Sequence, residues 1–269
     1  LDLHALAPEN YRLGQVSAAC GEAAFQYIVK AINYAMAGRV AGVVTAPINK
    51  EALHLAGHLY SGHTEIFADY THTPHYAMLL MSGRLRAIHC TTHVSMRKAC
   101  DLITRERVGE VIGLVDQAMR MMGLEHYTIG VAGLNAHCSE NGLFGTEEAE
   151  AISPAIQDAQ ARGIPVEGPI PPDTVFVKAL AGQYDVVVAM YHDQGHIPLK
   201  VVGFQLDAAT GRFTSLSGIN TTIGLPILRT SVDHGTAFDK AGKNLANEAS
   251  MVEALELAAQ MAPYYQKKE

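Results

Sequence analysis

Helix-period stretches alternate with short β-rich runs along most of this chain, and this alternation constrains the fold more than any other feature. Apolar residues at three- and four-residue spacing predict a helix at 25–36, and a strand at 41–45 follows directly. The pattern recurs with a helix at 108–122 and a strand at 127–132, and a glycine that can stop the helix follows each one. This order predicts an α/β fold in which helices cover a mostly parallel sheet.

Further elements continue the alternation towards the C-terminus. We expect helices at 147–162 and 248–261, and the uninterrupted apolar run at 186–190 indicates a buried strand. Residues 205–217 break the rhythm, because polar turn residues flank a short alternating run there. That pattern favours a β-hairpin.

Composition excludes several classes of protein. The 269 residues, 48% hydrophobic and 17% charged, can bury a large core as one domain or as two lobes. No apolar run approaches the roughly 20 residues that cross a bilayer, and the first residues lack the layout of a signal peptide. A net charge of -7, with no basic cluster beyond Lys267 and Lys268, argues against a nucleic-acid partner. The four scattered cysteines show no CxxC spacing, so we expect a cytoplasmic protein.

Three of the 13 histidines share a setting, because each follows a predicted strand. His93 ends LRAIHCTTH, His137 ends TIGVAGLNAH and His192 ends VVVAMYH. Ligands bind at the carboxyl ends of strands in open α/β sheets, so three imidazoles can converge there. They suit Zn, Ni, Co or Fe and leave a coordination position open for a substrate oxygen. We predict a catalytic metal centre in which Asp193 orients an imidazole; three unrelated loop histidines and a solvated acid are the alternative.

Two further clusters contain groups that bind anions or form turns. SGHTE, at 61–65, places hydroxyls and an imidazole ahead of a helix, which predicts an anion cradle or, alternatively, an ordinary helix N-cap. Lys200 and Arg229 are basic groups that a phosphate or carboxylate needs, or else members of exposed ion pairs. Residues 233–247 contain glycine turns but no GxGxxG after a strand, so the residues alone indicate turns and no Rossmann phosphate loop.

Long segments of the chain, from about Gly42 to Ala259, resemble the PdxA family, the 4-hydroxythreonine-4-phosphate dehydrogenases. The matching segments are VTAPINKEAL, SGHTE, TTHVSMR, GLNAHCSENGLFGTEE, GPIPPDTVF, AMYHDQGHIPLK and INTTIGLPILRTSVDHGTAFDKAG. The last is also similar to the HG(S/T)A adenine loop of the isocitrate and isopropylmalate dehydrogenases, which bind NAD(P) without a Rossmann fingerprint. The resemblance implies a two-lobed α/β/α fold of that dehydrogenase type, with a mostly parallel sheet and the active site in the inter-lobe cleft.

The resemblance also assigns roles to individual residues. The implied metal ligands are the three histidines already selected, His93, His137 and His192. The implied substrate contacts are His63, Thr64, Lys200, Asn220 and Arg229. The implied NAD contacts are His234, Gly235, Thr236, Ala237 and Asn247. In this family a metal ligand is shared across a dimer interface, which the resemblance implies for His192 or its partner ligands, so we expect a homodimer with the active site at that interface.

Two departures from the family pattern concern the ends and the middle of the chain. Members usually begin with a glycine-rich GDPAGIGPE-like segment, which is absent before Leu1, so we expect residues 1–269 to form one catalytic unit of two interleaved lobes with a shortened N-terminus. The stretch between Lys200 and Asn220 is about eleven residues longer than the simplest family pattern because of LDAATGRFTSL. This hairpin could alter specificity.

The implied reaction is oxidation of a secondary alcohol of a phosphorylated hydroxy acid by NAD, assisted by a divalent metal (Zn, Mg, Mn, Co or Ni). Oxidation β to the carboxylate then leads to loss of carbon dioxide. Lys200 is the expected base, with Asp193 or Asp233 as alternatives. The chain looks closer to the branch acting on 4-phospho-D-threonate or 4-phospho-D-erythronate than to the vitamin B6 branch. An aromatic cis-dihydrodiol dehydrogenase and a catalytically silent metal-binding homologue are the remaining alternatives.

Overall fold

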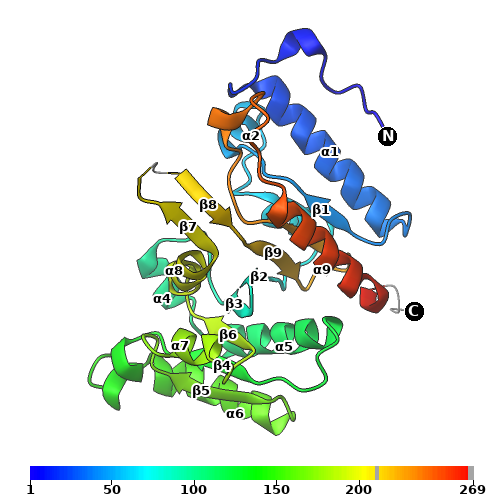
Figure 1. Cartoon of the computed structure of the whole chain (residues 1–269). Helices are drawn as coiled ribbons and strands as arrows, with labels where there is room; N and C mark the ends of the chain where they lie inside the picture. The colour runs from blue at the N-terminus through cyan, green and yellow to red at the C-terminus, as the bar shows by residue number, and fades with distance from the viewer. Residues whose placement is uncertain (210–211, 266–269) are drawn as a thin grey trace. The chain divides into compact units, whose positions relative to one another are not determined.

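The structure, a computed structural model, describes residues 1–209 and 212–265, with the backbone alone at 212–216. The chain forms two compact units (Figure 1). Unit 1 contains Leu1–Pro74 and the residues from Leu225 onward, and unit 2 contains His75–Gly224. None of the described helices is long and apolar enough to span a membrane.

Unit 2 is built on a sheet with the strand order β9-β2-β3-β6-β4-β5. Its strands are β2 (Ala77–Ser82), β3 (Leu85–His89), β4 (Ile129–Ala132), β5 (Val166–Ile170), β6 (Val186–Ala189) and β9 (Ile219–Ile223). The pairs β3/β6, β6/β4 and β4/β5 are parallel, whereas β2 pairs antiparallel with both β3 and β9. The sheet is therefore parallel through its middle and antiparallel at the β9 side.

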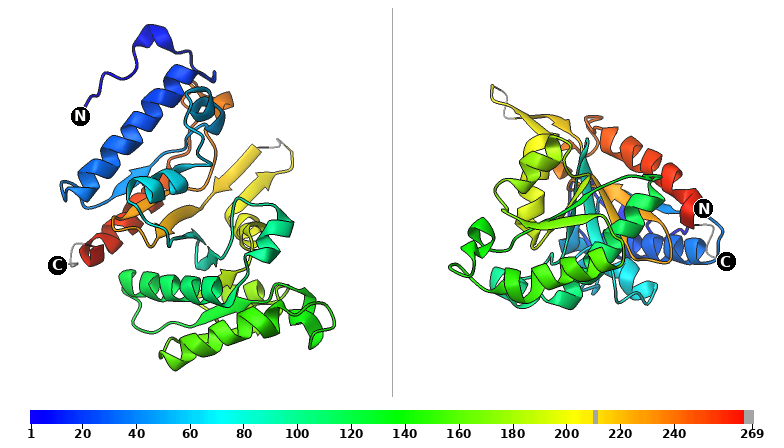
Figure 2. Two further views of the ribbon diagram at one scale, coloured as in Figure 1. Left: turned by 180° about the vertical axis from the view of Figure 1, so that it is seen from behind. Right: turned by 90° about the horizontal axis from the view of Figure 1, so that it is seen from below.

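Helices cover both faces of this sheet (Figure 2). The helical segments of unit 2 are α4 (Met96–Asp101), α5 (Arg105–Met121), η2 (Ala136–Glu140), a π-helix (Glu148–Ile152), α6 (Ser153–Ala161), α7 (Val175–Leu180) and α8 (His192–Gly203). Leu80, Ala87 and Val187 belong to a buried cluster with residues of α7 and α8. Helix α5 packs on β2, β3, β6 and β9 outside that cluster. Because both faces are covered, the strands read as continuous apolar runs.

Unit 1 pairs two short parallel strands, β1 (Val43–Thr45) and β10 (Arg229–Val232). Its helical segments are η1 (Pro8–Asn10), α1 (Ala18–Met36), α2 (Lys50–Leu55), α3 (His63–Tyr70), η4 (Phe238–Lys240) and α9 (Ala249–Tyr265). Helix α9 packs on both strands, while α1 packs on β1, α2 and α3. Strand β10 thus places its first residue, Arg229, in the interior of this unit, where it is 2% exposed.

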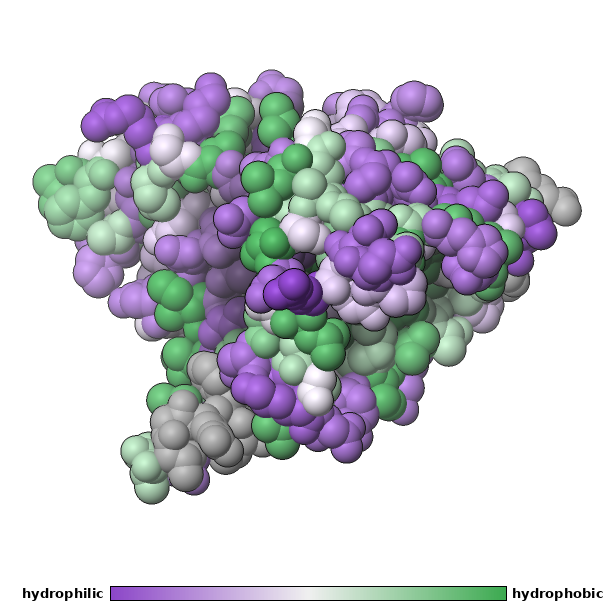
Figure 3. All heavy atoms as spheres, turned by 90° about the horizontal axis from the view of Figure 1, so that it is seen from above, coloured by the Kyte–Doolittle hydropathy of each residue, from purple (hydrophilic) through white to green (hydrophobic). Residues whose placement is uncertain are grey.

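The surface of the molecule carries polar and apolar side chains together. On the face drawn in Figure 3, hydrophilic and hydrophobic residues lie next to one another. Helix α8 exposes Ile197 and Val201. Exposed apolar side chains of this kind are common on folded proteins and do not by themselves indicate a partner.

The predicted α/β fold with a mostly parallel sheet is confirmed. The structure also contains the expected hairpin, as β7 (Phe204–Asp207) paired antiparallel with β8 (Arg212–Leu216); the tip at 210–211 lies outside the described residues. The helix predicted at 147–162 begins as a π-helix and becomes α6. The antiparallel strands β2 and β9 were not predicted.

Candidate active site

The middle of unit 2 brings three strand ends to one edge of the sheet. Strand β6 lies between β3 and β4 and is parallel to both, so the segments after the three strands leave at the same edge. Hydrogen bonds continue beyond the strands: the Cys90 N–H donates to the Ala189 oxygen (2.8 Å), and the Thr91 hydroxyl donates to the Met190 oxygen (2.9 Å). The predicted histidine segments therefore start from neighbouring strands.

Gln194 links two of these segments through its buried side chain. Its Oε1 accepts the Met190 N–H at 2.6 Å, and its Nε2 donates to the Gly133 oxygen at 2.8 Å. One amide therefore joins the segment after β6 to the segment after β4. Since Gln194 is only 8% exposed, water competes little for these bonds.

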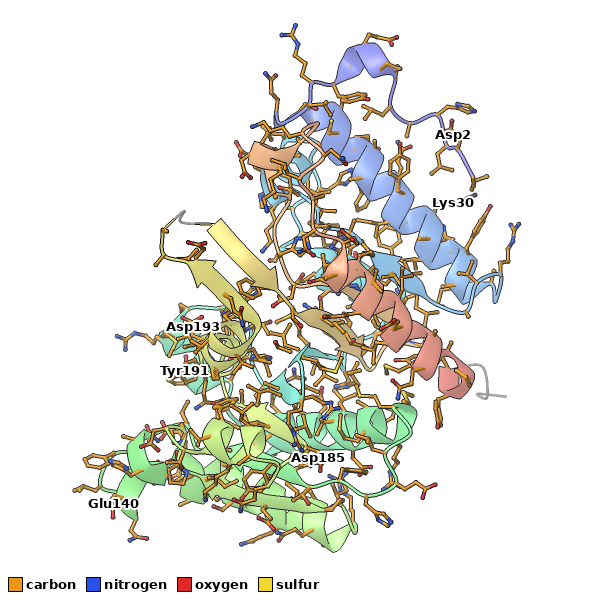
Figure 4. The ribbon with its side chains drawn as sticks, in the orientation of Figure 1. Asp2, Lys30, Glu140, Asp185, Tyr191 and Asp193 are labelled. Atoms are coloured by element: carbon orange, nitrogen blue, oxygen red, sulfur yellow. The ribbon has the colours of Figure 1, made fainter. Side chains whose placement is uncertain are left out.

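His93 and His192 lie near each other at this edge. Their ring centroids are 5.8 Å apart. Nδ1 of His192 lies 2.6 Å from Oδ1 of Asp193, a contact through which Asp193 would orient that imidazole, and this role stays a prediction. Figure 4 shows Tyr191 and Asp193 side by side where α8 begins. Two of the three predicted metal ligands and their carboxylate partner thus belong to one local arrangement.

His137 lies on a strained turn and does not complete this arrangement. Residues 137–141 have φ values between 46° and 60°, a run of five non-glycine residues in the left-handed region. Figure 4 shows Glu140 of this turn at the periphery of unit 2, away from Asp193. Among the residues that the structure describes, no three His, Cys, Asp or Glu side chains are placed to hold a metal ion. The three-histidine centre therefore stays a prediction.

Glu148 anchors the segment that leads into the strained turn. Glu148 is 4% exposed, and its carboxylate accepts the N–H groups of Leu134 (2.8 Å) and Asn135 (2.7 Å) and the Asn135 side-chain amide (2.9 Å). Burial alone would raise the pKa of this carboxyl, but the hydrogen bonds from Asn135 and Leu134 hold it below its usual value. Left-handed residues cost roughly 1–2 kcal/mol each, so such a turn needs an anchor of this kind.

In unit 1, the segment SGHTE leads into α3. Gly62 is the N-cap residue of this helix, and no side chain caps the helix start. Burial and the charge of Arg229 lower the pKa of His63 to about 3, so the imidazole is neutral at neutral pH. Burial lowers the pKa of Arg229 to about 10, which leaves its guanidinium charged. Arg229 donates to the Thr45 hydroxyl at 2.9 Å and lies 5.7 Å from the Phe67 ring centre. Arg229 is a buried cation, and the alternative of an exposed ion pair is wrong.

The other predicted substrate contacts belong to unit 2. Lys200, in α8, places its ammonium 4.1 Å from the centre of the Phe204 ring. Asn220, in β9, pairs with Leu80, and within the described part of the chain its Oδ1 is buried without a hydrogen-bond donor. A buried amide oxygen without a donor is a candidate acceptor for a ligand group.

The predicted cofactor residues of unit 1 lie in the loop between β10 and α9. Nδ1 of His234 lies 3.0 Å from the Gly235 oxygen, and Ala237 has a φ of 47°. Asn247 accepts the Ala249 N–H through Oδ1 at 2.9 Å, next to the start of α9. Its side chain therefore supports a helix start in this structure, and the NAD contact stays a prediction.

Sequence reasoning missed four residues that organise the edge of unit 2. Gln194 and Glu148 act through buried hydrogen bonds, and His89 and His196 pack against His192, with ring-centroid distances of 6.5 and 3.6 Å. The HDQGH motif was a usable signal for Gln194 and His196, since a helix beginning at its first histidine places residues two and four positions later near that start.

A sequence model of the family described as "Pyridoxal phosphate biosynthetic protein PdxA" matches residues 1–258. The chain belongs to the PdxA family. It is 49% identical over 255 residues to the D-threonate 4-phosphate dehydrogenase of Salmonella typhimurium (strain LT2), covering 95% of this chain and 75% of that protein.

Two solved structures extend this similarity. The 4-hydroxythreonine-4-phosphate dehydrogenase from Klebsiella pneumoniae matches with a TM-score of 0.79 and 48% identity, covering 95% of this chain and 75% of that one. The terephthalate 1,2-cis-dihydrodiol dehydrogenase from Burkholderia xenovorans LB400 matches with a TM-score of 0.70 and 32% identity, covering 97% and 79%. These members of known structure are named dehydrogenases, which supports the prediction that this PdxA-family chain is an oxidoreductase and points to a nicotinamide cofactor.

Replacing Glu148 tests the anchor of the strained turn. We expect Glu148→Ala to lower the free energy of unfolding by about 2–4 kcal/mol, because three donors lose their buried acceptor. Glu150→Ala is the matched control, since Glu150 is exposed on the same π-helix and its loss should change stability by less than about 0.5 kcal/mol. Equal urea midpoints for the two variants would show that Glu148 is not an anchor.

The lowered pKa of the partly buried His63 predicts a dependence of stability on pH. The folded-state pKa of about 3 lies below the ordinary value of 6.5, so only the unfolded chain takes up this proton between those values. Unfolding free energy should therefore fall as pH drops from 6.5 towards 3, by up to about 1.4 kcal/mol per pH unit from this group. Denaturant titrations between pH 7 and 4 should show a shallower loss for His63→Gln than for the wild type, and parallel curves would contradict the assignment.

Proposed function

We propose that this chain oxidises the 3-hydroxyl of a four-carbon hydroxy acid carrying a 4-phosphate, 4-phospho-D-threonate or 4-phospho-D-erythronate, with NAD and a divalent metal. Loss of carbon dioxide from the resulting β-keto acid would follow. The observation that carries this proposal is near-half identity, along almost the whole chain, to a protein named D-threonate 4-phosphate dehydrogenase. The four cysteines, all of them described and none in a disulfide, fit the cytoplasm as the place of this reaction.

The donor set at the edge of unit 2 fits a metal in part. Imidazoles are ligands for Zn, Co and Ni, and the proximity of His93 to His192 suits two ligands of one ion. Asp193 beside Nδ1 leaves Nε2 of His192 as the ligating atom, which is the usual arrangement of a metal-bound histidine. His137 is the third proposed ligand. When bound, the metal would supply Lewis acidity to the substrate hydroxyl, and NAD would accept a hydride.

Residues of the chain itself would bind the anionic groups and move the proton. Arg229, buried and charged, suits a phosphate or carboxylate oxygen, and the neutral His63 and the Thr64 hydroxyl can add hydrogen bonds. Asn220 would donate or accept one more bond. We assign the hydroxyl proton to Lys200, with Asp193 as the alternative acceptor. His234 to Ala237 and Asn247 are the proposed contacts of NAD.

The proposed reaction balances without a further co-reactant. The C3–H bond gives a hydride to oxidised NAD, and the C3 hydroxyl gives its proton to the base. The carboxylate carbon then leaves as carbon dioxide, and its bonding electrons stay on C2, which takes up a proton. The products are a three-carbon keto phosphate, carbon dioxide and reduced NAD.

We further propose that a second copy of the chain completes the metal site. Within the described part of one chain, His93 and His192 are neighbours but no three-ligand group exists. In a symmetric dimer a surface residue of one subunit can fill a place beside the other. His137, exposed on a turn whose backbone is already ordered, is the residue that we expect to be shared in this way.

A second candidate is the 4-hydroxythreonine-4-phosphate dehydrogenase reaction of vitamin B6 synthesis. The description of the matching family and the name of the Klebsiella pneumoniae structure favour it. That substrate differs at C2, which carries an amine in place of a hydroxyl. Oxidation of an aromatic cis-dihydrodiol is supported only by the less similar Burkholderia xenovorans protein.

A substrate panel separates these functions. With NAD and Co²⁺, we expect reduced nicotinamide, followed by its absorbance, to form from 4-phospho-D-threonate or 4-phospho-D-erythronate in preference to 4-hydroxythreonine 4-phosphate or a cis-dihydrodiol. His192→Ala should lower kcat/KM by more than about 100-fold, because a metal ligand is lost. Preference for the amine-bearing substrate would move the chain to the B6 branch, and no turnover of any substrate would refute the proposal.

Co-expression of two inactive variants tests the shared site. In a mixed dimer of His137→Ala with His192→Ala chains, one site carries both changes and the other carries neither. If pairing is random, we expect about one quarter of wild-type activity, since about half of the dimers have one intact site of two. Each variant alone should be inactive. Absence of recovery in dimers verified by mass would show that both histidines of a site come from one chain.

A further inference from the structure

His196 lies next to His192 on the same face of α8 and places a second imidazole there. Residues four apart on a helix lie one above the other. The two rings are stacked, with centroids 3.6 Å apart and planes inclined by 10°. Nδ1 of His196 also lies 2.9 Å from the backbone oxygen of His192. His196 therefore has its ring fixed by a backbone group and covers one face of the His192 ring.

A third imidazole, His89 at the end of β3, supports His196 from behind. His89 is fully buried, and its Nδ1 lies 3.2 Å from the Met78 oxygen. Its ring centroid is 4.8 Å from that of His196. The backbone of α8 approaches it so closely that a Cβ on Gly195 would lie 2.3 Å from His89 Nε2. The sheet and the helix thus hold His89 in place, and His196 is confined between it and His192.

The His192 ring is consequently restrained at two points. His196 covers one face of the ring, and Asp193 contacts its Nδ1 at 2.6 Å. The side chain of His192 is still 37% exposed and that of Asp193 66% exposed, so this arrangement does not serve to fill the core. A partly exposed imidazole with one nitrogen held and one ring face covered presents the other nitrogen, Nε2, in a set direction.

We propose that His196 is a positioning residue for His192: its stacked ring, backed by the buried His89, holds the His192 imidazole in the orientation in which Nε2 binds metal. The inference rests on the proposed function in one respect, the role of His192 as a metal ligand. Residues that orient a metal ligand typically change metal affinity by about 10–100-fold when they are removed. His196 contributes through ring contact and acts without binding the metal itself.

Binding of Co²⁺ by the full chain tests this role without substrate or NAD. The chelator-treated protein is titrated with Co²⁺, and calorimetry gives the affinity while visible absorption reports the ligand field. We expect His196→Leu to weaken binding by about 10–100-fold and to alter the absorption bands. His196→Phe, which keeps a ring to stack on His192, should recover most of the affinity. His126→Leu, which removes an exposed histidine between α5 and β4, is the matched control and should bind as the wild type does.

Each outcome decides between roles. Wild-type affinity and bands in His196→Leu would overturn the proposal, provided that His192→Ala has lost binding. A His196→Phe variant as weak as His196→Leu would also overturn it, because that result indicates a direct ligand. If His192→Ala still binds Co²⁺ normally, the premise and the proposal both fail. Thermal melts of the metal-free variants identify any loss of folding, and a destabilised Leu variant leaves the Phe variant to decide.

Failure of the proposed function is recognised separately. Suppose that the wild-type chain binds Co²⁺ tightly, that His196→Leu weakens this binding, and that the wild type turns over none of the phosphorylated acids. That result would refute the proposed reaction and support the positioning role. Where turnover is present, the variant should lower kcat more than it raises KM, since the substrate contacts in other segments are intact.

Discussion

The parallel pairing of β3, β6 and β4 is the constraint on which the edge of unit 2 depends. His89 pairs with Ala189, and Val131 pairs with Val188, so the three strands end at nearly the same level. Both faces of these strands are buried, and a register slip by one residue would exchange the side chains between two different helix layers. This register therefore fixes where the segments that carry His93, His137 and His192 begin.

The common sheet edge of His93 and His192 could be predicted from the sequence, whereas features that depend on long-range contacts could not. Parallel strands alternating with helices place their following residues at one edge, so His93 and His192 could be found together. Strand β2, AMLLMS, was missed because burial on both faces removes the alternation that identifies a strand. The left-handed turn at 137–141 could not be predicted, since non-glycine residues disfavour it and Glu148 stabilises its approach.

Burial also changes the meaning of the basic residues. From sequence, Arg229 could equally be an anion contact or a solvated ion pair. In the structure the charge of Glu65 and the Thr45 hydroxyl offset part of the cost of burying the guanidinium, which is nevertheless desolvated enough to lower its pKa. The imidazole of His63, whose pKa is lowered by burial and by the charge of Arg229, stays neutral and adds no second positive charge. A desolvated cation beside a neutral hydrogen-bonding group is suited to a single anionic group.

His137 and His192 are held by two different physical means. The His137 backbone lies in a costly conformation, which persists because the segment before it is tied to Glu148 and, through Gln194, to the neighbouring strand end. The His192 ring is restrained by contacts of its side chain, with Asp193 on one nitrogen and His196 against one face. In both cases the ordering cost is met during folding, before any ligand is present. The turn therefore presents His137 on an ordered backbone, which the proposed sharing of this ligand between two chains requires.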